Sequence, residues 1–299
     1  MIDVGTNSTR LLVADVVGGK VSPLERRSTV TRLGRGVDLS GHLSSEAIED
    51  VCTAIDGYVG LIGELGAERV NAIATSAVRD ADNGSAFVAE LRERFALSAR
   101  VLDGEEEARA TYVGATSESP PDEPTLVVDI GGGSTEMVVG RGAEISFHDS
   151  LQAGVVRHSE RHIAGDPPTA SELEALATDV RGLIEGAVDG GVVARRCIAV
   201  AGTPTSLAAV EMELEPYDPA RVHGHVLALP SIQRMLSQLA SAPLAERVEI
   251  PGLHPDRAPT IVAGVVILVE TMRAFGLEEV TVSEHDILYG TAISAAATA

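Results

Sequence analysis

One short pattern of residues occurs twice in the chain, and this repeat limits the folds that the sequence can adopt. Asp3–Val13 aligns without gaps on Asp129–Val139, and both segments read Asp, an aliphatic residue, Gly, two further residues and Ser-Thr. An apolar run follows the turn in each copy, so each copy predicts two short strands joined by a glycine turn. The copies lie too far apart for a solenoid repeat. They predict two duplicated α/β domains, each opening with such a hairpin.

The residues of both turns suit a bound phosphate. Glycine lets the backbone approach a ligand closely, and consecutive N–H groups form a nest for anionic oxygens. We therefore expect phosphate contacts from the two turns, in Gly5, Thr6, Asn7, Ser8, Gly131, Gly132, Gly133, Ser134 and Thr135. A structural turn explains one or two glycines, but not three between two carboxylates and two hydroxyls. Two such hairpins facing across a cleft would hold a polyphosphate between them.

The second copy also carries a candidate metal site. Asp129 and Glu136 flank its glycine turn, where they could hold a divalent cation that bridges the same phosphate oxygens. A third place suited to phosphate is Gly202–Ser206, a glycine-hydroxyl loop between a predicted strand and a predicted helix.

Length and composition fit two globular domains. The 299 residues, of which 44% are hydrophobic, are enough for two cores. Ser117–Pro124 is rich in Pro, Ser and acidic residues and is the best linker candidate. We expect one domain at 1–119 and the other at 120–299, with a closing helix at 287–297 that is able to pack back onto the first domain.

Charge and cysteine content restrict the location and the partners. The net charge of −21 argues against nucleic-acid binding, which needs a basic face. No apolar run reaches membrane-spanning length, so we expect no membrane partner. Cys52 and Cys197 form no metal or redox motif, which fits a reducing cytoplasm. Because the chain is acidic, an anionic substrate would need local amides, arginines and a metal to outweigh the overall field.

Two further segments matter for the function. Val70–Thr75 is predicted as a core strand, and Arg79 follows its carboxyl end, where open α/β sheets place ligand-binding residues. Glu105, Glu106 and Glu107 open a predicted helix. Acidic residues stabilise a first helical turn, so helix-dipole reasoning alone does not distinguish the three.

Five motifs, in this order, resemble the exopolyphosphatase/guanosine pentaphosphate phosphohydrolase (Ppx/GppA) family. They are Asp-Val-Gly-Thr-Asn-Ser at 3–8, Ala-Thr-Ser-Ala-Val-Arg at 74–79, Gly-Glu-Glu-Glu-Ala-Arg at 104–109, Asp-Ile-Gly-Gly-Gly-Ser-Thr-Glu at 129–136 and Ala-Gly-Thr at 201–203. The resemblance implies two ribonuclease-H-like domains of the actin, sugar kinase and heat-shock chaperone superfamily around a central cleft. It also implies removal of terminal phosphate from inorganic polyphosphate or guanosine pentaphosphate with Mg²⁺, or with Mn²⁺ in its place.

Residue by residue, the resemblance assigns roles. Glu107 matches the family's presumed catalytic base, and Arg79 matches an arginine that contacts phosphate. Asp129 and Glu136 match the metal carboxylates, and the two glycine hairpins match the phosphate loops. The chain resembles the short, two-domain members of the family.

These observations favour a cytoplasmic exopolyphosphatase, either a monomer or a homodimer. The alternative is a guanosine pentaphosphate 5′-phosphohydrolase, although no aromatic cluster near the motifs indicates a base pocket. A weaker alternative is a kinase of the same superfamily, which would need an adenosine pocket. A non-catalytic nucleotide or polyphosphate sensor is disfavoured because Glu107, Asp129 and Glu136 are all present.

Overall fold

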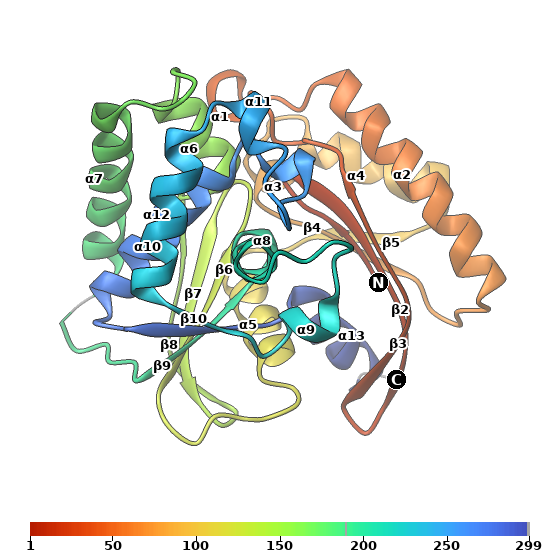
Figure 1. Cartoon of the computed structure of the whole chain (residues 1–299). Coiled ribbons are helices and arrows are strands. Elements are labelled where there is room, and N and C mark those ends of the chain that lie inside the picture. Colours follow the sequence, from red (N-terminus) through yellow and green to blue (C-terminus); the bar gives the residue numbers. More distant parts are fainter. Residues whose placement is uncertain (189, 298–299) are drawn as a thin grey trace. The chain divides into compact units, whose positions relative to one another are not determined.

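The computed structural model describes residues 1–188 and 190–297 (Figure 1). These residues form two compact units, the first made of Met1–Glu118 with the closing helix α13 (Ile287–Ala297) and the second of Ser119–Asp286. Within the described ranges, none of the helices combines the length and apolar character that a bilayer crossing requires.

A five-stranded mixed sheet organises the first unit. Its order is β3-β2-β1-β4-β5, with β1 antiparallel to β2 and parallel to β4, and β4 parallel to β5. The predicted first hairpin is therefore present, formed by β1 and β2. The strands are β1 (Ile2–Val4), β2 (Ser8–Val17), β3 (Lys20–Val30), β4 (Asn71–Ala74) and β5 (Ser98–Val101).

Helices of the first unit bury their apolar faces. The longest one, α2, begins after Ser44, whose side chain accepts a hydrogen bond from the Ala47 N–H, and it buries Val51, Ile55 and Ile62 at helical spacing. Helix α13 packs against α5 and β2. The helices are α1 (Val37–Ser40), α2 (Ser45–Glu64), α3 (Ser76–Asp80), α4 (Gly84–Phe95) and α5 (Gly104–Ala115).

The second unit repeats this topology. Its sheet has the order β10-β11-β9-β6-β7-β8, in which β8-β7-β6-β9-β11 corresponds to β3-β2-β1-β4-β5, and β10 extends the edge. The pairing directions also agree, because β6 is antiparallel to β7 and parallel to β9. The strands are β6 (Thr125–Ile130), β7 (Thr135–Arg141), β8 (Glu144–Leu151), β9 (Arg196–Val200), β10 (Val226–Ala228) and β11 (Glu279–Val282). The duplication read from the sequence is thus a duplication of the fold.

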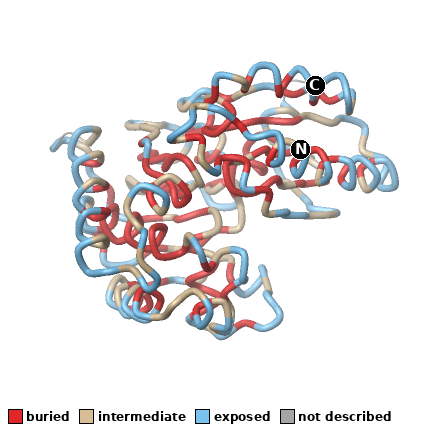
Figure 2. The backbone as a smooth tube through the Cα atoms, turned by 90° about the horizontal axis from the view of Figure 1, so that it is seen from above, coloured by how far each residue is buried: buried red, intermediate tan, exposed pale blue. Residues whose placement is uncertain are grey.

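The helices of the second unit surround a core that is mostly aliphatic. The helices are α6 (Val155–His162), α7 (Ala170–Ala187), α8 (Gly202–Glu211), α9 (Pro219–Val222), α10 (Leu229–Ser241), α11 (Leu244–Arg247), the 3₁₀ turn η1 (Pro255–Arg257) and α12 (Ile261–Ala274). Helix α12 is buried from Ile261 to Met272, as expected for a helix that is apolar all round. Figure 2 shows helices along which buried and exposed residues alternate.

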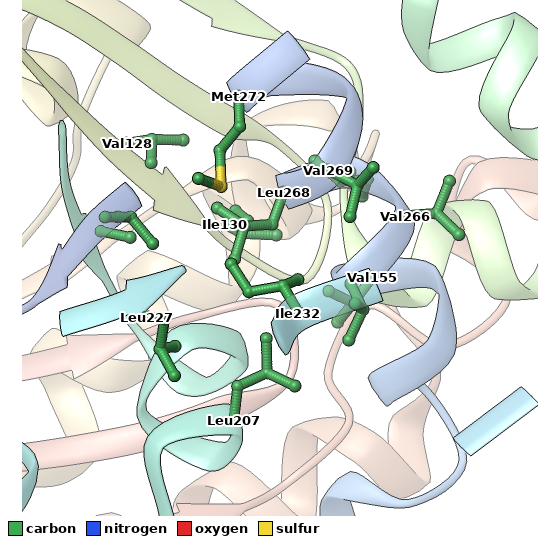
Figure 3. Close-up of a cluster of buried hydrophobic side chains, with 14 of the residues drawn as sticks. Val128, Ile130, Val155, Leu207, Leu227, Ile232, Val266, Leu268, Val269 and Met272 are labelled. Atoms are coloured by element: carbon green, nitrogen blue, oxygen red, sulfur yellow. The ribbon is translucent and has the colours of Figure 1, made fainter. Parts of the chain in front are cut away.

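The pleat of β6 separates the core from the candidate site. Leu126, Val128 and Ile130 belong to the main core, and Figure 3 shows Ile130 among side chains of α12 such as Leu268. Because successive side chains of a strand point to opposite faces, Asp129 lies on the other face of the sheet.

Candidate functional site

The turn between β1 and β2 presents hydrogen-bond donors. It is closed by a bond from the Gly5 N–H to the Ser8 carbonyl (3.1 Å). The N–H groups of Thr6 and Asn7 donate to no group in the described chain. The side-chain Nδ2 of Asn7 and Oγ of Ser8 are buried and also lack a hydrogen-bond partner among the described residues. Buried donors normally have partners, so this turn is prepared for an acceptor such as phosphate.

Thr6 connects this turn to α3. Its Oγ1 accepts a hydrogen bond from the Ala77 N–H at 3.1 Å, so the side chain satisfies one of the free N–H groups at the start of that helix. Helix α3 follows β4 and carries Arg79 in its last turn. The predicted phosphate turn and the predicted phosphate-contacting arginine are therefore placed by one connected segment of structure.

The three glutamates at the start of α5 have different environments. Glu106 completes a capping box with Asp103 and also pairs with Arg100, Nη1 to Oε1 2.6 Å. Glu105 is exposed and pairs with Arg109 one turn later, Nε to Oε1 3.1 Å. Glu107 alone is buried, with 6% of its surface exposed. The three glutamates thus differ in burial and in hydrogen-bond partners, although the helix dipole favours an acidic residue at each of their positions.

Glu107 and Arg79 form a partly buried ion pair. Arg79 Nη1 lies 2.8 Å from Glu107 Oε2 and donates to the Leu102 carbonyl at 3.0 Å. Burial strengthens such a pair relative to an exposed one, because water screens it less. The first unit therefore holds a positioned carboxylate and a positioned guanidinium, both predicted as functional from the sequence.

The turn between β6 and β7 has the same construction as the first turn. The Gly131 N–H donates to the Ser134 carbonyl at 3.0 Å, and the N–H groups of Gly132 and Gly133 have no acceptor in the described chain. The Thr135 hydroxyl donates to the Ala153 carbonyl at 2.5 Å, so this side chain secures the turn.

Helix α6 closes against the carbonyl side of this turn. The N–H groups of Val155 and Val156 donate to the Gly131 and Gly132 carbonyls, each at 2.9 Å. This approach requires glycine at position 154, because a Cβ there would lie 2.3 Å from the Gly132 carbonyl oxygen. With the carbonyls bound by α6, the free N–H groups are the atoms that the turn offers to a ligand.

Asp129 and Glu136 are directly opposite each other on β6 and β7. Both are buried, with exposures of 7% and 1%, and Glu136 Oε1 accepts a hydrogen bond from Ser150 Oγ at 2.9 Å. Two acidic side chains at facing positions of adjacent strands repel each other, and burial increases the cost. A divalent cation would remove this repulsion, so the donor set fits Mg²⁺ or Mn²⁺.

The corresponding pair in the first hairpin is different. Asp3 faces Arg10 in the strand register, and Arg10 Nε lies 2.8 Å from Asp3 Oδ2. Arg10 stands where the second hairpin has Glu136. The first hairpin therefore neutralises its carboxylate with an arginine.

Two further arginines of the second unit lie at its candidate phosphate-binding loops, and sequence reasoning missed both. Arg157 donates from Nε to the Gly133 carbonyl at 2.8 Å. The Arg257 guanidinium lies so close to Gly202 that a Cβ at 202 would approach its Nη1 to 2.2 Å. The backbone before that helix is also unusual, because Ala201 has a φ of 71°. The only sequence signal was that Arg157 lies three residues after Gly154, and Arg257 gave none.

The comparisons with known proteins agree with this architecture. Residues 12–295 match the model of the Ppx/GppA phosphatase family. The chain is 36% identical to a protein named exopolyphosphatase 2 from Mycobacterium tuberculosis, over 99% of this chain and 97% of that protein. It is 29% identical to a guanosine-5′-triphosphate,3′-diphosphate pyrophosphatase from Photobacterium profundum, over 94% of this chain but 56% of that protein.

Solved structures lead to the same result. The structure of the Ppx/GppA family member from Aquifex aeolicus superposes with a TM-score of 0.84 at 32% identity, covering 99% of this chain and 96% of that one. The duplicated fold, the order of the motifs and the match along nearly the whole chain all agree. The chain belongs to the Ppx/GppA phosphatase family.

Proposed function

We propose that the protein is an exopolyphosphatase that hydrolyses the terminal phosphoanhydride of inorganic polyphosphate. One observation carries the proposal most of all. Two turns of the same construction each offer two N–H groups that have no acceptor within residues 1–188 and 190–297. Of the two, only the second turn stands between two buried carboxylates. The family and the name of the M. tuberculosis relative support the same activity. The two free, buried cysteines are consistent with a cytoplasmic enzyme.

The binding groups are matched to phosphate. The N–H groups of Thr6, Asn7, Gly132 and Gly133 would donate to phosphate oxygens, and the Asn7 and Ser8 side chains would add buried donors. These short-range contacts let an acidic chain bind a polyanion, because long-range repulsion from exposed charges is screened by salt.

Asp129 and Glu136 would hold the metal ion, Mg²⁺ or Mn²⁺. When bound, it would neutralise charge on the phosphate oxygens during transfer. The buried position of both carboxylates and the Ser150 hydrogen bond to Glu136 keep their oxygens oriented for this task.

Glu107 would accept a hydrogen bond from the attacking water and take its proton. General-base assistance of this kind contributes roughly 10²–10⁴-fold to the rate. Arg79, at 2.8 Å, holds the Glu107 carboxylate in place. A phosphate that accepts a hydrogen bond from Arg79 would compete with Glu107 for the guanidinium. Substrate binding would then release Glu107 to act on water.

Hydrolysis of guanosine pentaphosphate is the second candidate function, and one observation favours it. The P. profundum relative carries a name for that class of activity and matches 94% of this chain. Both reactions cleave a terminal phosphoanhydride, so the same groups would serve both.

Phosphate release should be measured from short polyphosphate, long polyphosphate and guanosine pentaphosphate, side by side with Mg²⁺, for the wild type and for Glu107→Gln. We expect the highest kcat/KM on polyphosphate, and a loss of that activity in the variant. A tenfold or greater preference for guanosine pentaphosphate would replace the proposal with the second candidate. No release from any of the three would overturn both.

A further inference from the structure

Helix α6 carries two histidines that the proposed hydrolysis does not use. His158 and His162 are one helical turn apart, with ring centroids separated by 5.5 Å. Asp179 of α7 lies beside both, since its Oδ2 is 2.8 Å from His162 Nε2 and 3.5 Å from His158 Nε2. One ligand atom from each of the three residues lies within 4.8 Å of the others. Two imidazoles and a carboxylate from two helices therefore converge on one point.

His158 is the unusual member of this cluster. Its side chain is fully buried, and neither ring nitrogen has a hydrogen-bond partner among the described residues. Burial lowers the pKa of His158 to about 4, because the charged ring is poorly solvated there. No protein donor therefore uses a lone pair of this imidazole among the described residues. Buried polar groups normally have partners, so this ring lacks one that a ligand would supply.

The distances suit a transition metal. Zinc binds imidazole nitrogen and carboxylate oxygen at about 2.0–2.2 Å, so neighbouring ligand atoms of a tetrahedral site lie roughly 3.3 Å apart. The 3.5 Å between His158 and Asp179 is close to this value, whereas the 2.8 Å contact of His162 must open by about 0.5 Å. His162 and Asp179 also line an open hollow with Glu174 and Thr178, which leaves access for a water molecule as a further ligand.

We propose that His158, His162 and Asp179 bind one divalent transition metal ion of the zinc class, which ties α6 to α7. Mixed imidazole and carboxylate ligands favour zinc over magnesium, whereas the oxygen-only pair Asp129 and Glu136 favours magnesium. This site stands independently of the proposed hydrolysis. Since Val155 and Val156 at the other end of α6 hold the glycine turn, the metal fixes the helix that supports that turn.

The charges around the site act in both directions. The carboxyl end of α6 carries the negative end of the helix dipole, which stabilises a cation. Arg161 weakens cation binding, because its Nη1 lies 3.6 Å from Asp179 Oδ2 and competes for that carboxylate. The positive charge of Arg157 also disfavours a cation at His158. Replacement of Arg161 by an uncharged residue should therefore strengthen metal binding, while replacement of a ligand weakens it.

Cobalt titration tests the site directly. Chelator-treated protein is titrated with Co²⁺ in saturating Mg²⁺, and the visible absorption is followed, because tetrahedral cobalt absorbs strongly whereas oxygen-bound octahedral cobalt absorbs weakly. The variants are His162→Ala, Asp179→Asn and Arg161→Gln. His254→Ala is the matched control, since His254 is an exposed histidine near a single carboxylate, Asp256. Thermal unfolding of each variant without metal checks that it is folded. If His162→Ala does not fold, Asp179→Asn, which keeps the shape of the side chain, is the variant that tests the site.

The wild type and His254→Ala should give the intense tetrahedral spectrum at one cobalt per chain. Either ligand variant should bind at least roughly tenfold more weakly, and Arg161→Gln about threefold more tightly. Zinc should displace the cobalt and raise the unfolding temperature only where the site is intact. Absence of the tetrahedral spectrum in the wild type, or unchanged affinity in a folded His162→Ala or Asp179→Asn protein, would overturn the proposal.

Discussion

The two glycine hairpins share a backbone but differ in charge. Both turns are closed by a bond from the first glycine N–H to the serine carbonyl, and both leave two successive N–H groups without an acceptor among the residues described. The cross-strand pair beside the turn is Asp3 with Arg10 in the first hairpin and Asp129 with Glu136 in the second. One pair is self-neutralising and the other is doubly acidic.

This difference indicates how two copies of one hairpin can differ in function. Both copies have the same backbone donors, so we propose that both bind phosphate. The residue that faces the aspartate is Arg10 in the first hairpin and Glu136 in the second, so we propose a cation only for the second. The first unit also holds Arg79 and Glu107, which form a partly buried ion pair.

The largest expected effect is a difference in Mg²⁺ requirement between variants of Asp129 and Asp3. Asp129→Asn should lower kcat/KM about 10²-fold or more and raise the Mg²⁺ concentration for half-maximal activity at least roughly tenfold, because it removes a charged metal ligand. Asp3→Asn should leave the Mg²⁺ requirement within about twofold of wild type, because its partner is Arg10. Mg²⁺ titrations of phosphate release measure both. Equal changes in the Mg²⁺ requirement of the two variants would contradict the assignment of the metal to the second hairpin alone.

The next effect tests the task of the first unit. Glu107→Gln should reduce kcat at least roughly tenfold without raising KM, because amide and carboxylate have similar size but only the carboxylate accepts the proton. Glu105→Gln and Glu106→Gln should be much milder, since Glu105 is exposed and glutamine can also complete the capping box. A normal rate in Glu107→Gln, with a loss in either neighbour, would show that the base is elsewhere, and Glu136 would be examined first.

A smaller effect is expected at Arg79. Arg79→Lys keeps a positive charge beside the buried Glu107 but loses the guanidinium fork, so KM should rise roughly fivefold or more. Arg109→Lys is the matched control, because Arg109 is exposed and pairs only with the exposed Glu105 in the contacts described. Steady-state kinetics at several polyphosphate concentrations give both KM values. Equal changes in the two proteins would mean that bulk charge, rather than a site, governs affinity.

The smallest effect concerns the support of the second turn. Gly154→Ala places a methyl group 2.3 Å from the Gly132 carbonyl oxygen and should lower the free energy of unfolding by about 1–3 kcal/mol. Gly186→Ala, in α7 with open space around it, should raise it by up to about 1 kcal/mol. Urea unfolding compares the two. A Gly154→Ala protein as stable as wild type would show that the turn does not need close contact with α6.

Local patterns predicted the elements near the site well, because each depends on residues close in sequence. The strand–glycine–strand repeat predicted both hairpins. Features that depend on contacts between residues far apart in the sequence could not be predicted from local patterns. The three glutamates could be told apart only by family position until Arg79 and Arg100 were seen beside two of them.

The residues that sequence reasoning missed also depend on contacts between distant parts of the chain. The spacing of His158 and His162 on a helix is readable from the sequence, but the third member, Asp179, comes from another helix. Arg257 approaches Gly202 from a 3₁₀ turn that no periodicity indicates. Residue types in the sequence identify what could bind, and tertiary packing decides which of them meet.

The central claim is that the metal belongs to the acidic hairpin. Anomalous diffraction from crystals grown with Mn²⁺ and a non-hydrolysable polyphosphate analogue tests it most directly. We expect a manganese peak within bonding distance of Asp129 and Glu136 carboxylate oxygens, and none beside the Asp3–Arg10 pair. A peak beside Asp3, or no peak at Asp129 and Glu136 in crystals that contain the bound analogue, would contradict the account.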